Sequence, residues 1–460
     1  MLKWLRGISD NGGLILKQLT KKLLTVLMIP MMLLTMINIP QVSAKETLGL
    51  HVDAAILIDA ETGKILYAEN IDEPLGIASM TKMMTEYLLF EAIDEGKVTW
   101  DQEYRVTDYT YKMSQDRRLS NVPLREDGTY TVKELYEAMA IYSANAATVA
   151  ISEIIAGTEK EFVNLMNEKA EELGLKDYKF VNSTGLNNEF LQGNHLKGTK
   201  KTDENVMPTR SVAILAHHLL KDYPEVLKTS KIQTKLFRKG TSDEIKMDNW
   251  NFMLPGAVYA YKGIDGLKTG TTDFAGHTFT ATAKRGDKRL ISVVMNALDA
   301  KGKESPSARF DETRKLLDYG FAQFTEEALV PAGYEFKDQK TLPVQKGKEK
   351  SVKLAVKDPI NMMIKTKDKD LYTPELVLDK SLLKDGALEA PLKKGTVVGH
   401  VQMIHQEDGD AGYVEQQDAG EVILTEDVEK AGWFKLSMRA TGAFFSNIWA
   451  SATEFVKGLF

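Results

Sequence analysis

The chain has 460 residues, enough for two or three domains. Hydrophobic residues make up 43% and charged residues 27%, a balance typical of a globular protein with an ample core. The absence of cysteine excludes thiolate nucleophiles, disulfide bonds and cysteine-based zinc sites. The formal net charge of −6 lacks the basic footprint of a nucleic-acid-binding protein, so no nucleic-acid partner is expected. The seven histidines include no HExxH spacing, and no metal site is predicted.

Residues 1–44 have the pattern of an export signal. Basic residues precede an apolar run from Leu23 to Ile39, and Val42-Ser-Ala44 then forms a small-residue cleavage site. Because the run is long for a signal peptide, an uncleaved membrane helix is the alternative. Cleavage would begin the mature chain near Lys45 and place it outside the cytoplasmic membrane.

Residues 45–325 are predicted to form an α/β domain with an antiparallel sheet. Alternating apolar residues predict a hairpin made of Ala55–Asp59 and Ile65–Ala68. Helical periodicity follows over residues 79–95, 132–142, 146–155, 160–173 and 210–220. Strands at 277–284 and 289–297 close the domain, joined by the turn Arg285-Gly-Asp-Lys288. Because strands lie at both ends of residues 45–325 with helices between them, we expect the two groups of strands to pair in one antiparallel sheet.

Residues 326–428 have a different texture and predict a small all-β domain. Short alternating stretches such as Ser351–Val356 and Thr396–Gln402 are separated by turns rich in lysine and glycine. Residues 429–460 then predict an amphipathic helix that lies in a membrane interface. Its apolar face consists of Phe444, Phe445, Ile448, Trp449, Ala452, Phe455, Val456 and Leu459. The alternative is a terminal helix docked on the protein's own core.

The first motif with chemical meaning is Ser79-Met-Thr-Lys82. At the start of a helix, residues three apart share a face, so the lysine amine can lie beside the serine hydroxyl. A serine hydroxyl becomes a nucleophile when a neighbouring base takes its proton, and a lysine with a lowered pKa can be that base. Ser381-Leu-Leu-Lys384 has the same spacing inside the β domain and is interpreted as surface.

Two further motifs complete a set. Ser143-Ala-Asn145 lies between two predicted helices, where both polar residues can be helix caps. As catalytic groups, Ser143 would relay a proton to the leaving amine, and Asn145 would bind a substrate carbonyl and hold Lys82. Two interpretations of Lys268-Thr-Gly270 are possible. It is either a strand end with a solvated lysine or an edge strand that pairs with an extended peptide.

In the second interpretation each residue of the third motif has a role. Lys268 supplies positive charge, Thr269 bonds the substrate carboxylate, and Gly270 allows close backbone approach. The amide of Thr271 would join that of Ser79 in an oxyanion hole.

The three motifs together are the signature of class A β-lactamases and penicillin-binding proteins. The chain closely resembles the low-molecular-mass penicillin-binding proteins that act as D-alanyl-D-alanine carboxypeptidases. The likeness extends to Phe180–Leu186, Asp265–Gly270 and Leu290–Met295, and to the order of leader, catalytic domain, β domain and terminal helix. It implies a serine β-lactamase/penicillin-binding-protein-like α/β fold.

The resemblance also implies roles for single residues. Ser79 would be the acylated nucleophile, Lys82 the proton acceptor, Ser143 the relay and Lys268 a substrate contact. An arginine in the helix after the last core strands would hold the substrate carboxylate. Arg309 is the candidate, and Arg314 the alternative.

The implied reaction removes the terminal D-alanine from peptidoglycan stem pentapeptides without a cofactor. β-Lactam antibiotics would acylate the same serine, and the enzyme would work at the outer face of the cytoplasmic membrane. Two alternatives stand beside this reading. A class A-like β-lactamase would need a glutamate in an ExxLN stretch, which the region between the second and third motifs lacks. A catalytically inactive cell-wall binding protein would lack Ser79 or Lys82, and both are present.

Overall fold

The computed structural model describes residues 47–407, 410–415, 418–434 and 436–438. The predicted export signal and the apolar face of the predicted terminal helix lie outside these residues. The predicted start of that helix at residue 429 is wrong, because Lys430 pairs with Gly347 in a β-bridge and helical structure begins at Trp433. Within the described part of the chain, no helix combines the length and the apolar character needed to cross a bilayer.

A five-stranded antiparallel sheet forms the centre of the first domain, in the order β2-β1-β11-β10-β9. The strands are β1 (Ala54–Asp59), β2 (Ile65–Glu69), β9 (Ile264–Thr272), β10 (Gly276–Arg285) and β11 (Lys288–Met295). The antiparallel sheet, its first hairpin and its last hairpin are therefore confirmed. β9 carries the third motif and forms one edge of this sheet, as predicted.

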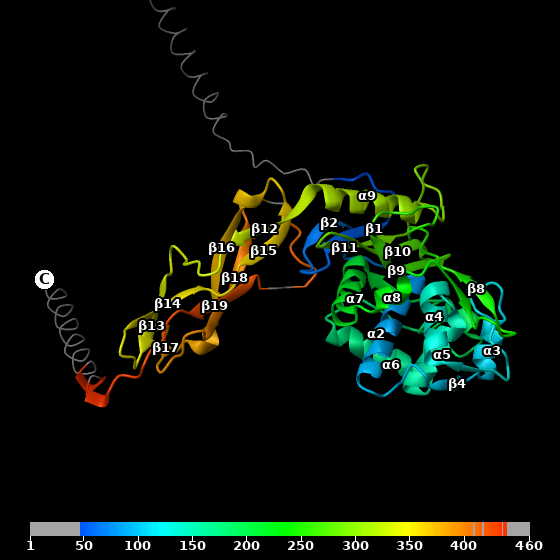
Figure 1. Ribbon diagram of the computed structural model, residues 1–460, viewed down its shortest axis with the longest axis horizontal. Coiled ribbons are helices and arrows are strands. Elements are labelled where there is room, and N and C mark those ends of the chain that lie inside the picture. Colours follow the sequence, from blue (N-terminus) through cyan, green and yellow to red (C-terminus); the bar gives the residue numbers. More distant parts are fainter. Residues whose placement is uncertain (1–46, 408–409, 416–417, 435, 439–460) are drawn as a thin grey trace, which may run out of the picture. The chain divides into compact units, whose positions relative to one another are not determined.

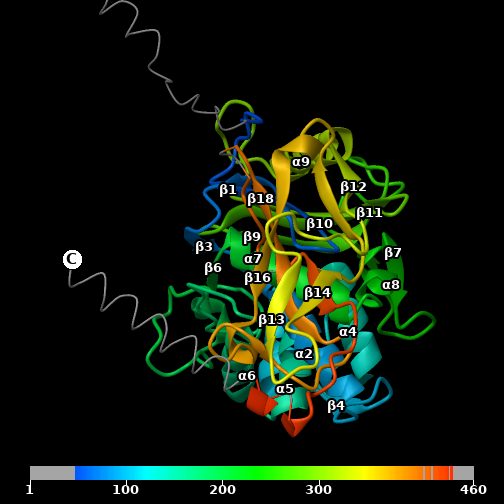
Figure 2. The ribbon, with the colours of Figure 1, turned by 90° about the vertical axis from the view of Figure 1, so that its left-hand side faces the viewer.

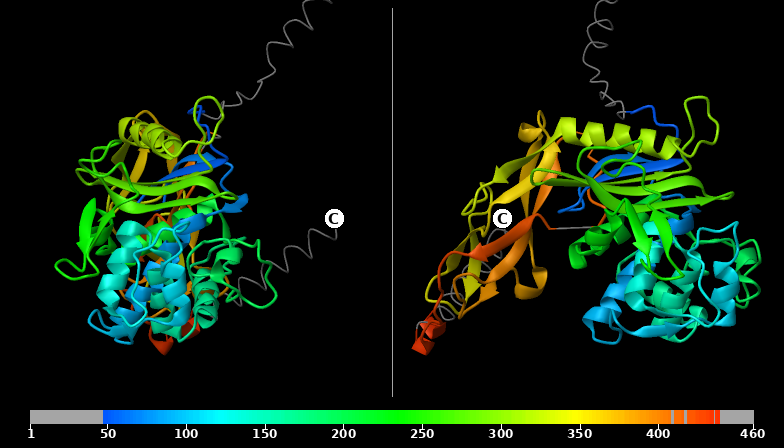
Figure 3. Two further views of the ribbon diagram at one scale, coloured as in Figure 1. Left: turned by 90° about the vertical axis from the view of Figure 1, so that its right-hand side faces the viewer. Right: turned by 45° about the vertical axis from the view of Figure 1, so that its right-hand side comes forward.

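Both faces of this sheet are covered, which explains the continuous apolar run of β1. All six residues of β1 are buried. Because side chains alternate along a strand, Ile56 and Ile58 pack into one core and Leu57 packs into another. Helices including α7 (Thr209–Asp222) cover the first face, and α9 (Ala308–Gln323) lies on the second, as Figures 1 and 3 show.

The helix α9 approaches the sheet closely at Gly320. A Cβ added to Gly320 would lie 2.6 Å from Leu57 Cδ2 and 2.7 Å from Leu290 Cδ1. These distances are shorter than an ordinary carbon–carbon contact, so a side chain at position 320 would require the leucine side chains or the helix to move.

Helices fill the chain between the two groups of strands, and the longer ones agree with the predicted periodicity. They are η1 (Ala78–Thr81), α2 (Lys82–Asp94), α3 (Asp108–Ser114), α4 (Val132–Tyr142), α5 (Asn145–Ala156), α6 (Glu159–Glu172), η2 (Asn188–Leu191), α7 and α8 (Val226–Ser230). The first predicted helix differs, because it begins as the 3₁₀ turn η1 and becomes α-helical only at Lys82. Short elements were missed: α3, α8, and the ribbons β3–β6 (Pro74–Gly76, Val206–Pro208), β4–β5 (Glu103–Arg105, Thr129–Thr131) and β7–β8 (Thr234–Phe237, Ile245–Asp248).

The C-terminal domain is all-β, as predicted, and its strands face the viewer in Figure 2. β12 (Phe324–Val330) pairs with β15 (Ile360–Lys365) and follows directly on the end of α9 at Gln323. The other strands form a six-stranded sheet in the order β16-β18-β19-β14-β13-β17. They are β13 (Thr341–Gln345), β14 (Ser351–Val356), β16 (Tyr372–Leu378), β17 (Leu388–Glu389), β18 (Val397–His405) and β19 (Gly420–Leu424). Their apolar residues form a core of their own.

Candidate active site

Ser79 lies in η1, one turn before α2 begins. It is partly exposed, whereas its neighbours Ala78 and Met80 are fully buried. Ala78 has a positive φ of 45°, a conformation that costs a non-glycine residue about 1–3 kcal/mol. Such strain persists where the surrounding structure imposes it. Here the strained residue is the first of η1 and directly precedes Ser79.

Lys82 has its amine beside the Ser79 hydroxyl. Lys82 Nζ lies 2.9 Å from Ser79 Oγ, 2.8 Å from Asn145 Oδ1 and 2.8 Å from the main-chain oxygen of Thr184. The lysine is completely buried. Burial lowers the pKa of Lys82 well below its ordinary value, and the positive charge of Lys268 lowers this pKa further.

The three partners of Lys82 determine what its neutral amine can do. The oxygens of Asn145 and Thr184 only accept hydrogen bonds, so they take the two N–H groups of a neutral amine. The nitrogen lone pair is then left for the Ser79 hydroxyl, which can donate. In this state Lys82 is oriented as a base toward Ser79.

The second motif divides into two structural roles. Asn145 is the first residue of α5, and its Nδ2 donates to the main-chain oxygen of Ser120 at 3.0 Å. Both ends of its amide are thus bonded, and it holds Lys82 instead of capping a helix. Ser143 ends α4 in a left-handed conformation with a φ of 58°. Among the described residues, none forms a hydrogen bond with its hydroxyl, which leaves it available to a reacting group.

The carbonyl of Thr184 belongs to the site and was not predicted to do so. Asn182 Oδ1 accepts from the amide of Thr184 at 3.1 Å and from that of Gly185 at 2.7 Å. Gly185 has a φ of +81°, and an added Cβ would overlap the main-chain oxygen of Ala78. A tight turn thus presses the segment 182–186 against η1 and aims its carbonyl at Lys82. The segment was noticed only through its family likeness, because a main-chain acceptor has no side-chain signature.

The edge strand β9 reaches the serine turn through Gly270. A Cβ added to Gly270 would lie 2.8 Å from the oxygen of Ile77 and 3.0 Å from Ala78 Cβ. Only glycine lets the edge strand come this close to η1. Lys268 and Thr269 are buried in the same strand, and Thr271, beyond them, is exposed.

Lys268 and Glu86 are both buried, and each influences the pKa of the other. Burial lowers the pKa of Lys268 to about 8. The nearby charge of Arg309 also lowers this pKa, whereas Glu86 raises it. Burial raises the pKa of Glu86 to about 7. Glu86 was not predicted, although one signal existed: it is an acidic residue one turn beyond Lys82 among apolar neighbours. Lys268 is thus charged at neutral pH and favours a neutral Lys82.

Arg309 lies at the start of α9 beside the end of β9. Its Nη1 donates to the main-chain oxygens of Gly270 and Thr278, at 2.8 and 3.1 Å. Its Nη2 donates to Thr271 Oγ1 at 2.7 Å. Arg314, the predicted alternative, instead donates to the main-chain oxygen of Tyr259 at 2.9 Å. The structure therefore brings Arg309, and not Arg314, to the third motif.

Family comparison decides between the enzyme classes that share these motifs. Residues 41–299 match the Peptidase_S11 family model, described as D-alanyl-D-alanine carboxypeptidase. Residues 324–430 match the model of the penicillin-binding protein 5 C-terminal domain. The chain belongs to the D-alanyl-D-alanine carboxypeptidase family.

Individual relatives of this carboxypeptidase share nearly its whole length. D-alanyl-D-alanine carboxypeptidase DacF from Bacillus subtilis is 34% identical over 428 residues, which cover 92% of this chain and 98% of the relative. The crystal structure of a peptidoglycan synthesis regulatory factor, PBP3 from Streptococcus pneumoniae, has a TM-score of 0.66 and 35% identity, and covers 82% of this chain and 99% of its own. Penicillin-binding protein 5 from Haemophilus influenzae has a TM-score of 0.64 and 29% identity, with coverage of 83% and 98%. The predicted family, fold class and serine-hydrolase class are confirmed.

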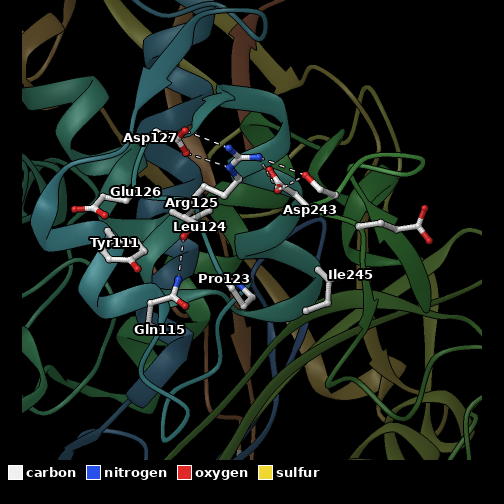
Figure 4. Close-up of a pocket in the computed structure, with 11 residues that line it drawn as sticks. Tyr111, Gln115, Pro123, Leu124, Arg125, Glu126, Asp127, Asp243 and Ile245 are labelled. Atoms are coloured by element: carbon white, nitrogen blue, oxygen red, sulfur yellow. Dashed lines mark hydrogen bonds and ion pairs between the residues drawn. The ribbon is translucent and has the colours of Figure 1, made fainter.

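A cavity elsewhere in the carboxypeptidase domain contains none of the predicted site residues. Its volume is about 470 Å³, and Figure 4 shows it between the segments of Pro123–Asp127 and Asp243–Ile245. Arg125 in its wall donates to both carboxylate oxygens of Asp127, at 3.1 Å each. Its positive charge is therefore paired within the wall, and nothing in the cavity resembles the chemistry around Ser79.

The close approach of Gly185 to η1 gives a stability prediction for this carboxypeptidase. We expect Gly185→Ala to lower the free energy of unfolding by about 2 kcal/mol more than Gly193→Ala does. Both glycines have a positive φ, but a Cβ at Gly193 meets no atom within 4 Å. Urea unfolding of the two variants measures the difference. Equal losses would show that the Gly185 turn tolerates a side chain and that the contact with Ala78 is not tight.

Proposed function

We propose that this carboxypeptidase removes the terminal D-alanine of peptidoglycan stem peptides through an acyl-enzyme on Ser79. The observation that carries the proposal is the amine of Lys82, held by Asn145 and Thr184 so that a neutral nitrogen directs its lone pair to Ser79. A general base within hydrogen-bond distance is what a serine hydroxyl needs in order to attack an amide.

In the first step Lys82 takes the proton of Ser79 while the serine oxygen attacks the carbonyl carbon of the D-Ala–D-Ala bond. The amides of Ser79 and Thr271 stabilise the negative charge that forms on the carbonyl oxygen. Ser143 relays a proton to the leaving amine, and the carbon–nitrogen bond breaks. Free D-alanine departs, and the rest of the peptide remains as an ester of Ser79.

In the second step a water molecule attacks the ester, and Lys82 again takes the proton. The serine is regenerated and the shortened peptide leaves. A β-lactam antibiotic also forms an ester with Ser79, but the amine released by ring opening stays attached to the acyl group, so hydrolysis is slow. This difference accounts for covalent labelling by penicillins.

Recognition of the free carboxylate at the end of the substrate would select the last peptide bond for cleavage. Arg309, Lys268 and Thr269 supply positive charge and hydrogen-bond donors at the end of β9. Burial lowers the pKa of Arg309 to about 10, yet the group stays charged at neutral pH. A buried cation beside an open strand edge favours an anionic chain end, and hence a carboxypeptidase.

Labelling with a fluorescent penicillin tests the assignment of Ser79. We expect Ser79→Ala to abolish both the label and the release of D-alanine from an acyl-D-Ala-D-Ala peptide. Ser381→Ala is the matched control, because Ser381 has the same spacing to a lysine on an exposed surface, and this variant should keep both activities. Label that persists in the Ser79→Ala protein would refute the nucleophile.

We also propose that the enzyme works outside the cytoplasmic membrane, with residues 45–325 as the catalytic domain and 326–428 as the β domain. Residues 1–44 would direct export, and the amphipathic segment that follows Gly432 would bind the membrane surface from that side. The support is the sequence pattern, with apolar and polar residues on opposite helical faces. The known relatives point to action on the cell wall.

Deletion of residues 430–460 tests the anchor. We expect the shortened protein to appear in the soluble fraction of broken cells and to keep its activity on peptide substrates. The whole chain should sediment with membranes under the same conditions. Membrane retention of the shortened protein would contradict the proposed anchor.

A further inference from the structure

The guanidinium of Arg309 is completely bonded before any substrate arrives. An arginine side chain has five N–H groups. In Arg309, Nε donates to the oxygen of Pro306, and Nη1 to those of Gly270 and Thr278. Nη2 donates to Thr271 Oγ1 at 2.7 Å and to His277 Nδ1 at 2.5 Å. Each N–H has an acceptor, and none of the acceptors is a carboxylate.

The two ends of this guanidinium differ in how firmly they are held. Nε and Nη1 bond main-chain oxygens, which the fold fixes. Nη2 bonds two side chains, and one of them, Thr271, is exposed. A substrate carboxylate can therefore reach Arg309 at Nη2, where it replaces or joins the threonine hydroxyl. The orientation of Nη2 then depends on its second partner, His277.

The pairing of β10 with β9 determines the position of His277. This residue lies on β10 directly opposite Thr271 of β9. Since Arg309 can only donate, His277 Nδ1 must accept, and the proton of the neutral ring is then on Nε2. Partial burial and the charge of Arg309 lower the pKa of His277, while Glu304 opposes them. The ring is thus neutral at pH 7, and Arg309 bears the positive charge of this pair.

We propose that His277 is a positioning residue for recognition of the substrate carboxylate. Its Nδ1 holds the Nη2 end of Arg309 toward Thr271, in the orientation that a carboxylate at the end of β9 requires. The residue acts through Arg309 and touches no reacting atom. This inference rests on the proposed function, because it specifies how that function selects a free chain end.

Two substitutions of His277 test its role in positioning Arg309. They differ in where they place the hydrogen-bond acceptor. Asn at position 277 puts an amide oxygen close to the place of Nδ1, whereas Gln puts it close to the place of Nε2. The measured quantity is the ratio of kcat/KM for an acyl-D-Ala-D-Ala peptide to kcat/KM for its C-terminal carboxamide. We expect His277→Gln to lower this ratio about tenfold, mainly through the KM of the free acid, and His277→Asn to keep it within about threefold.

Controls separate this role from general damage and from failure of the proposed reaction. In an Arg309→Ala background, His277→Gln should leave the ratio unchanged, because the group it positions is gone. The inference would be overturned if the wild-type, His277→Gln and His277→Asn proteins all had the same ratio. It would also be overturned if His277→Gln kept the wild-type ratio and His277→Asn lowered it. Wild-type protein that releases no D-alanine from the free acid would instead refute the proposed function.

Discussion

Lys82→Met is expected to slow acylation of Ser79 by about 10²–10⁴-fold, the usual contribution of a general base. Methionine has nearly the length of lysine but offers no nitrogen to take the serine proton. The variant should still fold, because methionine fills the same buried space, but the oxygens of Asn145 and Thr184 each lose a donor, and stability should fall by about 1–3 kcal/mol for each. Stopped-flow labelling with a fluorescent penicillin measures the rate, and thermal unfolding measures stability.

The chain contains its own control for this substitution. Lys384 has the same spacing from a serine as Lys82, but 71% of its side chain is exposed. Lys384→Met should therefore acylate at the wild-type rate. A Lys82→Met protein that is folded and acylates within tenfold of wild type would eliminate Lys82 as the base.

Lys268→Gln is expected to lower kcat/KM for a free-acid peptide about tenfold to a hundredfold and to move its pH dependence. The positive charge of Lys268 lowers the pKa of Lys82, so removing this charge raises it. Lys82 then becomes neutral only at higher pH, and the acidic limb of the profile moves upward. In the wild type, Lys268 has a pKa of about 8, and loss of its charge should lower activity above that pH.

Lys268→Arg separates the two effects of this residue. Arginine keeps a positive charge at all relevant pH values, so the acidic limb should stay in place. The decline above about pH 8 should disappear, because no group at position 268 loses its proton there. A Lys268→Gln profile with the same acidic limb as the wild type would contradict the electrostatic coupling of the two lysines.

The parts of the site that were predictable are side chains in short local patterns. Ser79 and Lys82 are three residues apart at a helix start, so they share a face, and this spacing made the pair recognisable in the sequence. Gly270 was predicted to allow close approach of a bound peptide, and its contact with η1 was not predicted. Amphipathic periods predicted helices such as α4, α6 and α7, whereas short elements such as α3 and α8 contain too few residues to show a period.

The parts that were not predictable depend on contacts distant in sequence. The oxygen of Thr184 reaches Lys82 across 102 residues, and as a main-chain group it could come from any residue type. His277 meets Arg309 only because β10 pairs with β9 and α9 begins beside that edge. The choice between Arg309 and Arg314 also needed coordinates, since five residues separate them and either one can face the sheet.

The glycine at the far end of α9 has a consequence for catalysis. Gly320 is eleven residues beyond Arg309, which is about 16 Å along a helix. A methyl group at position 320 would displace the side chains of Leu57 and Leu290 or tilt that end of α9 away from the sheet. The tilt would be transmitted along α9 to its first turn, where displacement of the guanidinium by less than 1 Å breaks bonds that are now 2.7–3.2 Å long. Substrate affinity would then be sensitive to a residue that never comes near the substrate.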